Sequence, residues 1–183
     1  MISFYSKILL GNRFIGDTGN ICKISLDAAD FLLAMNWFKS FWSYKFKKMG
    51  LRYEIGLNIK TGDICWWNGP FPPGDMNDDM CFRDCLAMWL PPGECVETDK
   101  GYRASFPERV QCPPFEGPDR REMTQRVRNR HETVNRRMKR WNILKAAYRH
   151  NLYDHQAVFG AVACMTQLAF ENGEPLFQVE YND

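Results

Sequence analysis

The chain has 183 residues, of which 45% are hydrophobic and 25% charged. This composition is typical of one globular domain that buries roughly 70% of its unfolded surface. Its most apolar stretch, residues 157–165, is too short to cross a bilayer, and the apolar run after Lys7 is too short for a secretory signal. We therefore expect an intracellular protein without a membrane span, whose seven cysteines are reduced thiols.

The first half of the chain contains a weakly patterned lead-in and then strands. We expect residues 1–20 to be the lead-in and residues 21–183 to form the domain. Residues 21–27 alternate apolar and polar side chains, which predicts a strand that ends at Asp27. Strict alternation over residues 51–60 predicts the clearest strand, and residues 64–67 begin its return partner in a hairpin.

The second half contains the predicted helices. Residues 76–90 form a helix that Pro91-Pro92-Gly93 ends, and residues 94–98 form a strand that ends at Asp99. One short strand is expected around Val110, and two helices are expected over residues 119–148 and 154–171. This order predicts an α/β fold, with a mixed sheet flanked by helices and a helical C-terminal part.

Three acids are candidate ligands of a divalent metal. Asp27 and Asp99 are expected at strand ends, and Glu132 lies on the predicted helix 119–148. Carboxylate oxygens are the ligands that Mg²⁺ and Mn²⁺ prefer. Each acid also has a purely structural reading: Asp27 could cap a helix or end a strand, Asp99 could begin a turn, and Glu132 could be a solvated ion-pair member.

The predicted helix 119–148 concentrates the positive charge. The net charge of the chain is only +2, yet residues 119–150 hold 11 basic and 3 acidic side chains. Helical spacing places Val127, Val134, Met138 and Trp141 on one stripe and Glu132 nearly opposite. Arg128, Arg136 and Lys139 lie on the side of Glu132, so this face is either a solvated basic surface or a phosphate-binding one.

His131 and two cysteines have two readings each. His131 could act as a general base or contact phosphate, or it could pack locally. Cys81 and Cys85 have helical i, i+4 spacing and could share a zinc ion, but no second ligand pair with such spacing follows them, which favours packing in the core.

The motifs around the three acids also form an ordered set. The first is Asp27-Ala28-Ala29-Asp30-Phe31, and the second is Trp42-Ser43-Tyr44-Lys45-Phe46 followed by Gly50-Leu51-Arg52-Tyr53-Glu54. Then come Gly69-Pro70-Phe71-Pro72, Asp99-Lys100-Gly101-Tyr102, and Arg128-Asn129-Arg130-His131-Glu132-Thr133-Val134-Asn135. From about residue 21 onward, this series resembles the DDE transposase domain of the PIF/Harbinger type.

The resemblance implies an RNase H-like fold in which Asp27, Asp99 and Glu132 form the catalytic triad and hold Mg²⁺ or Mn²⁺. It implies DNA as the substrate, phosphodiester cleavage as the reaction and the nucleus as the location. The alternative is a catalytically lapsed domain that keeps the fold and binds nucleic acid or protein.

The sequence departs from that family pattern in two places. Ala28-Ala29 stands where the family has Gly-Thr, which could change how Asp27 is aimed. The family also has an N-terminal helical DNA-binding region, and the residues before Ile21 are too few for one. We therefore expect a truncated copy or an incomplete gene model. The alternative is a domesticated remnant whose site-specific DNA binding is supplied by a partner protein.

Overall fold

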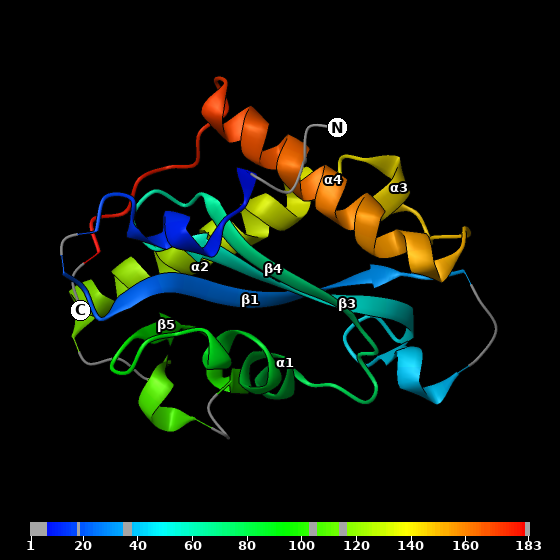
Figure 1. The fold of residues 1–183 in the computed structure, drawn as a ribbon, viewed down its shortest axis with the longest axis horizontal. Helices are drawn as coiled ribbons and strands as arrows, with labels where there is room; N and C mark the ends of the chain where they lie inside the picture. Colours follow the sequence, from blue (N-terminus) through cyan, green and yellow to red (C-terminus); the bar gives the residue numbers. More distant parts are fainter. Residues whose placement is uncertain (1–6, 18, 35–37, 103–105, 114–116, 182–183) are drawn as a thin grey trace.

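The computed structural model describes residues 7–17, 19–34, 38–102, 106–113 and 117–181. Its centre is a six-stranded mixed sheet with strand order β2-β3-β1-β5-β6, and β4 also pairs with β3 (Figure 1). β1 (Cys22–Leu32) and β3 (Lys48–Asn58) are antiparallel, whereas β5 (Cys95–Glu97) runs parallel to both β1 and β6 (Val110–Gln111). The predicted α/β class, with a mixed sheet and a helical C-terminal part, is confirmed, and the arrangement is consistent with an RNase H-like fold.

The strand β1 is longer than its sequence pattern predicts. It continues through Asp27 to Leu32 because β3 pairs with it from Ile24↔Asn58 to Leu32↔Gly50. The buried carboxylate of Asp30 is accommodated by Arg52 on β3, whose Nε lies 2.8 Å from Asp30 Oδ1. Asp27 therefore lies in the middle of a strand, and its predicted place at a strand end is wrong.

The predicted hairpin is confirmed, and its strands are extended by pairing. β3 meets β4 (Ile64–Phe71) across a turn in which the Asn58 side chain accepts from the backbone N–H groups of Lys60 and Thr61. A short strand that the sequence did not indicate, β2 (Trp42–Ser43), pairs with the beginning of β3.

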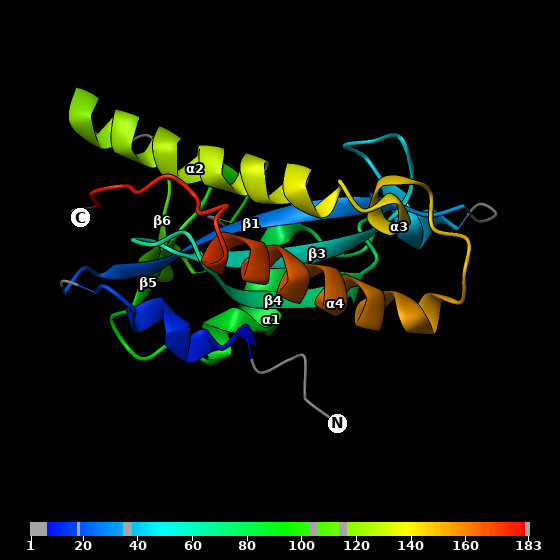
Figure 2. The same ribbon diagram turned by 90° about the horizontal axis from the view of Figure 1, so that it is seen from above.

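The helices lie on both faces of the sheet. α1 (Asp78–Asp84) and the 3₁₀ turn η4 (Leu86–Met88) cover one face, while α2 (Pro118–Met138) and α4 (Leu152–Glu171) cover the other (Figures 1 and 2). The Asn77 and Asn151 side chains cap the N-termini of α1 and α4. The predicted bounds of α4 are nearly correct, whereas the predicted helix over residues 76–90 is shorter and breaks at Cys85.

The long basic helix also ends earlier than predicted. α2 stops at Met138, and a separate short helix, α3 (Asn142–Lys145), follows. The chain then returns to the sheet, where the Tyr148 N–H donates to Leu32 O at 2.8 Å and Tyr148 O accepts from Ala34 N at 2.9 Å. Trp141 consequently leaves the helical stripe and is exposed, while Val127, Val134 and Met138 are fully buried as predicted.

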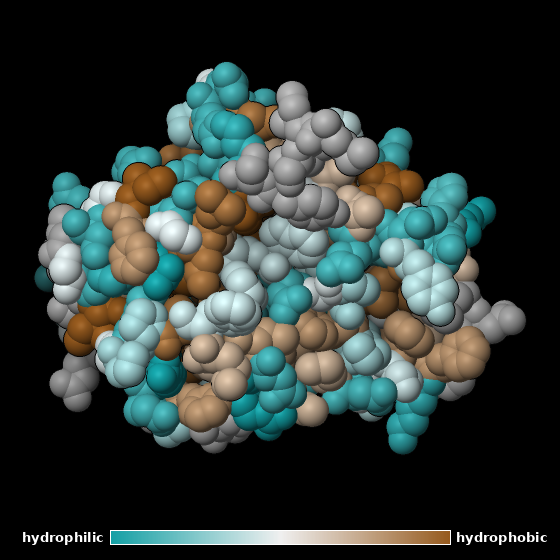
Figure 3. All heavy atoms as spheres, viewed as in Figure 1, coloured by the Kyte–Doolittle hydropathy of each residue, from teal (hydrophilic) through white to brown (hydrophobic). Residues whose placement is uncertain are grey.

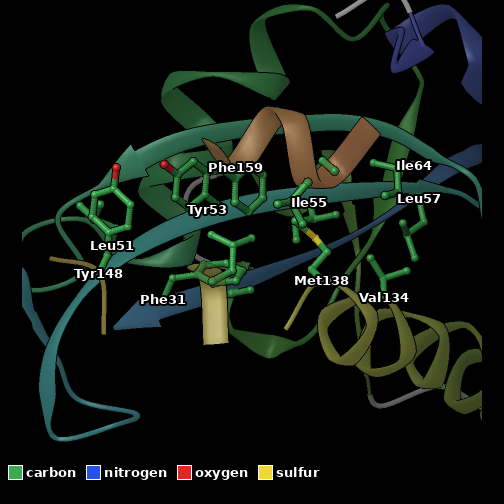
Figure 4. Close-up of a cluster of buried hydrophobic side chains, with 14 of the residues drawn as sticks. Phe31, Leu51, Tyr53, Ile55, Leu57, Ile64, Val134, Met138, Tyr148 and Phe159 are labelled. Carbon is green, nitrogen blue, oxygen red and sulfur yellow. The ribbon is translucent and has the colours of Figure 1, made fainter. Parts of the chain in front are cut away.

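The larger core lies between the sheet and the pair α2 and α4. Phe159 of α4 stacks on Tyr53 of β3 with ring centroids 3.8 Å apart, and Phe31 of β1 meets both rings edge-on (Figure 4). Val134 and Met138 of α2 complete this cluster. A second cluster under α1 and η4 fills the opposite face, so β1 and β3 are covered on both sides.

The segment before β1 also packs on the sheet. It contains the 3₁₀ helix η2 (Leu10–Phe14), and the buried Arg13 makes two bonds to Glu94, with Nε–Oε1 at 2.7 Å and Nη2–Oε2 at 3.3 Å. Exposed hydrophobic side chains are scattered, and the face in Figure 3 mixes hydrophilic and hydrophobic patches. None of the helices in the described residues is both long and apolar enough to cross a membrane.

Candidate active site

A cavity of about 150 Å³ lies between β1, β5 and α2, and Asp27, Asp99 and Glu132 all line it. Asp27 comes from the middle of β1, Asp99 from the loop just after β5, and Glu132 from the middle of α2. Figure 2 shows α2 running alongside β1, and Glu132 on this helix lines the same cavity as Asp27. The three acids that the sequence singled out, spread over more than 100 residues of chain, therefore share one site.

The site is open because β5 is short and leaves part of the edge of β1 unpaired within the described residues. β5 pairs with β1 only as far as Ser25↔Glu97. In the part of the chain that the structure describes, no other strand pairs with this edge of β1 until the bridge between Leu33 and Tyr148. Asp27 lies just beyond the last paired residue, and Asp99 follows the end of β5, so the two carboxylates face the same opening.

The surroundings of Asp27 destabilise the ionised form of its carboxyl group. Burial raises its pKa to about 6, and the negative charges of Asp99 and Asp78 add to the rise, whereas Lys45 opposes it. At neutral pH the site therefore holds a partly buried negative charge that a cation would stabilise.

Asp99 and Glu132 are exposed at the mouth of the cavity. Asp99 Oδ1 accepts a hydrogen bond from the Gly101 N–H at 2.7 Å, which fixes the carboxylate at the start of a turn. Asp99 therefore begins a turn and also lines the cavity, so its two predicted roles are compatible. Glu132 makes no hydrogen bond or ion pair within the described residues, so it is not held by the neighbouring arginines.

The donor chemistry of the cavity fits a hard divalent cation, but the side chains are not gathered around one point. Four carboxylates line it, those of Asp27, Glu97, Asp99 and Glu132, and burial and neighbouring acids together raise the pKa of Asp27. Across the described ranges, however, no three Asp, Glu, His or Cys side chains lie close enough together to hold a metal ion. Asp27, Asp99 and Glu132 would have to approach one another to bind the same ion.

Of the three predicted phosphate contacts, Arg128 reaches the cavity. It lines the wall, and its Nη2 donates to Thr98 O at 2.9 Å, which holds the guanidinium between α2 and the loop after β5. Arg136 is exposed on α2. Lys139 is engaged in the fold: its Nζ lies 3.3 Å from Asp30 O and about 5 Å from the rings of Phe31 and Phe46.

His131 packs inside the protein, as the local reading of this residue predicted. It is 4% exposed, and its Nε2 lies 2.9 Å from Ser25 Oγ. Burial and the positive charge of Arg130 lower its pKa to about 3, so the imidazole is neutral at physiological pH. His131 therefore joins α2 to β1 in the wall of the cavity.

Two further acids adjoin the site, and the sequence analysis did not assign them to it. Glu97 is 1% exposed and lines the cavity, and within the described residues neither carboxyl oxygen has a hydrogen bond of ordinary geometry. Burial raises its pKa to about 7, although the nearby Tyr181 hydroxyl and arginines oppose the rise. A signal for Glu97 was present in the sequence: it lies two residues before Asp99 on the predicted strand 94–98, and strand alternation would direct both side chains to the same side.

Asp78, at the start of α1, is the second. A methyl group placed on Gly101 would lie 3.0 Å from Asp99 Oδ1 and 3.3 Å from Asp78 Oδ2, so these carboxylates border the same small space. Asp78 is also paired with Arg52, whose Nη1 lies 2.8 Å from its Oδ1. Its position in a run of helix-starting acids gave no sign of this neighbour.

The two cysteines with helical spacing lie elsewhere. Cys81 is buried and Cys85 is half-buried, and both are free thiols. Burial raises the pKa of each thiol, which favours the protonated form. This environment fits the core-packing reading.

Comparison with known proteins gives one family. The DDE superfamily endonuclease family matches residues 33–167. No curated protein and no solved structure shows a significant match to the chain.

Proposed function

The chain belongs to the DDE superfamily endonuclease family, and on that basis we propose that it is a metal-dependent DNA endonuclease domain of transposase origin. We assign Asp27, Asp99 and Glu132 as its catalytic triad and Mg²⁺ or Mn²⁺ as its cofactor. The observation that carries the proposal is that all three acids line one cavity beside an anchored arginine. The motif series quoted above supports the finer PIF/Harbinger assignment, and with it action on nuclear DNA.

The proposed reaction is displacement at a DNA phosphodiester, with water or a DNA 3′-hydroxyl as nucleophile. A bound divalent cation would supply positive charge for the phosphate oxygens and make water a better nucleophile at neutral pH. Asp27, Asp99 and Glu132 would hold that cation. Arg128, fixed by its bond to Thr98 O, would orient a phosphate over the acids. The guanidinium would thus be in position before the reaction begins.

A second candidate is a catalytically lapsed domain that binds DNA. It is favoured by the separation of the acids, because no three metal-binding side chains in the described residues stand within reach of one ion. Arg136 and the other basic residues of α2 could bind phosphates without any such ion. The two candidates differ in their response to metal.

The test is nicking of supercoiled plasmid with Mg²⁺ or Mn²⁺ by the wild-type chain and by Asp99→Asn. The endonuclease proposal predicts metal-dependent nicking that falls by more than about a hundredfold in the variant, since even outer-shell changes at metal sites cost up to that much. Asp154→Asn, an exposed acid in the first turn of α4, is the matched control and should cut like wild type. Nicking that survives unchanged in Asp99→Asn would refute the assignment, and DNA binding without nicking would favour the lapsed domain.

A further inference from the structure

A short basic turn lies where the C-terminal end of α2 meets the last residues of β1. It comprises residues 44–47 and joins β2 to β3 (Figure 1). Ser43 fixes its base: its hydroxyl donates to Asp30 Oδ2 at 2.6 Å and accepts from the Phe46 N–H at 3.2 Å. The Lys47 N–H donates to Ser43 O at 2.8 Å and closes the turn, with Lys47 in the left-handed region at φ 52°.

This turn is also attached to α2. The ring of Phe46 lies 5.1 Å from Lys139 Nζ, and the same ammonium group is 3.3 Å from the backbone oxygen of Asp30 on β1. Three elements therefore meet at one point: the turn, the C-terminal part of β1 and the C-terminal end of α2. Because both ends of the turn are bonded to the sheet, its tip is held in a defined position.

At the tip of the turn lies Lys45, a cation that stabilises no particular contact among the described residues. It is exposed, and within the described residues it forms no hydrogen bond and no ion pair. The neighbouring cations differ: Arg52 is bound to Asp30 and Asp78, and Lys139 is half-buried against aromatic rings. Lys45 is thus, like the exposed Lys47 and Lys48 next to it, a cation whose charge is available to a ligand. It differs from them because its charge acts on Asp27.

Lys45 is also close to the acids of the cavity. Among neighbouring charges, it has the largest effect on Asp27, where it lowers the pKa, and it acts in the same direction on Asp78. It also lowers the pKa of Lys139. The contacts of the turn agree with this placement, because Ser43 at its base bonds to Asp30, three residues from Asp27, and Phe46 lies against Lys139. An ammonium group that lies near two carboxylates without pairing with either is positioned for an anion that approaches over them.

We propose that Lys45 is a phosphate-binding residue for the DNA strand that lies across the cavity, so that DNA is held between the 44–47 turn and the basic face of α2. This inference rests on the proposed function, because it takes DNA as the ligand. Arg128 at one side of Asp27 and Lys45 at the other would bind successive phosphates of one backbone. Arg128 would keep its bond to Thr98 O while it binds the phosphate.

The test is the salt dependence of duplex DNA binding by the full chain, measured by fluorescence anisotropy in EDTA so that cleavage does not interfere. Lys45→Gln should weaken binding about tenfold near 0.1 M salt and reduce the slope of log K against log salt by roughly 0.9, the loss of one phosphate contact. Lys45→Arg should restore both values. Lys48→Gln, the same charge change at an exposed residue three positions away, is the matched control and should bind like wild type.

Plasmid nicking by the wild-type chain in Mn²⁺, run in parallel, separates this inference from the proposed function. If wild type nicks DNA but Lys45→Gln matches Lys48→Gln in affinity and slope, Lys45 is not a phosphate contact and the endonuclease proposal stands. If Lys45→Gln weakens binding as described but wild type never nicks, the contact is supported and the endonuclease proposal fails. No measurable DNA binding by wild type would overturn both.

Discussion

Replacing Asp27 by Asn should stabilise the metal-free protein at neutral pH. Asn has nearly the same shape, but it removes a charge that the site accommodates poorly. The difference between a pKa of about 6 in the folded chain and the ordinary 3.8 corresponds to roughly 3 kcal/mol, at about 1.36 kcal/mol per pH unit. Solvent screening at the mouth of the cavity lowers the expected gain to about 1–2 kcal/mol.

The stability that Asp27→Asn gains over wild type should increase with pH. Between pH 3.8 and about 6 the folded chain binds more protons at Asp27 than the unfolded chain does. The wild-type protein therefore loses stability as pH rises through this window. Asp27→Asn has no such loss, so the difference between the two proteins should open from pH 4 to pH 6 and stay constant above it.

The assay is thermal or urea unfolding in EDTA at several pH values. For a chain of this length, about 1–2 kcal/mol corresponds to a rise in Tm of roughly 2–8 °C. Added Mg²⁺ or Mn²⁺ should stabilise wild type and leave Asp27→Asn unchanged, because the variant lacks a ligand. Equal or lower stability of Asp27→Asn at pH 7.5 would show that the Asp27 charge is not strained, and the electrostatic reasoning about the site would then be wrong.

Two further predictions concern the scaffold around the site. Burial holds the pKa of His131 near 3 instead of 6.5, so the contribution of His131 to the stability of the fold should fall as pH drops below 6.5. NMR of the imidazole should show no titration between pH 5 and 8. A titration midpoint in that range would contradict its buried, neutral state. Glu94→Gln should cost about 3–5 kcal/mol in urea unfolding, because it leaves Arg13 charged and unpaired inside the protein; a loss below about 1 kcal/mol would mean that the segment before β1 is not fixed by this pair.

The sequence identified those elements whose pattern is local. The alternation over residues 51–60 predicted β3. The helical spacing of Val127, Val134 and Met138 predicted the inner face of α2, where all three are buried. The same reasoning placed Glu132 on the outer face, where it lies. These predictions succeeded because each depends on a period of two or 3.6 residues within one segment.

Element ends were predicted less well, because long-range pairing decides them. The polar residues of Asp27-Ala28-Ala29-Asp30 suggested the end of a strand, but β3 and its Arg52 carry β1 on to Leu32. Continued helical periodicity suggested that α2 would run to residue 148. Instead the chain leaves the helix after Met138, and Tyr148 pairs with the end of β1.

What the sequence by itself determined was the set of acids, their order and the type of element that carries most of them. What only the tertiary structure decided was the neighbourhood: that β5 stops level with Ser25, that Glu97 and Asp78 adjoin the acids, and that the turn carrying Lys45 is bonded to β1 at Asp30. The physical reason is that side-chain periodicity encodes which face of an element is buried. It does not encode which elements meet, since strand pairing joins residues far apart in the chain and depends on the packing of the whole sheet.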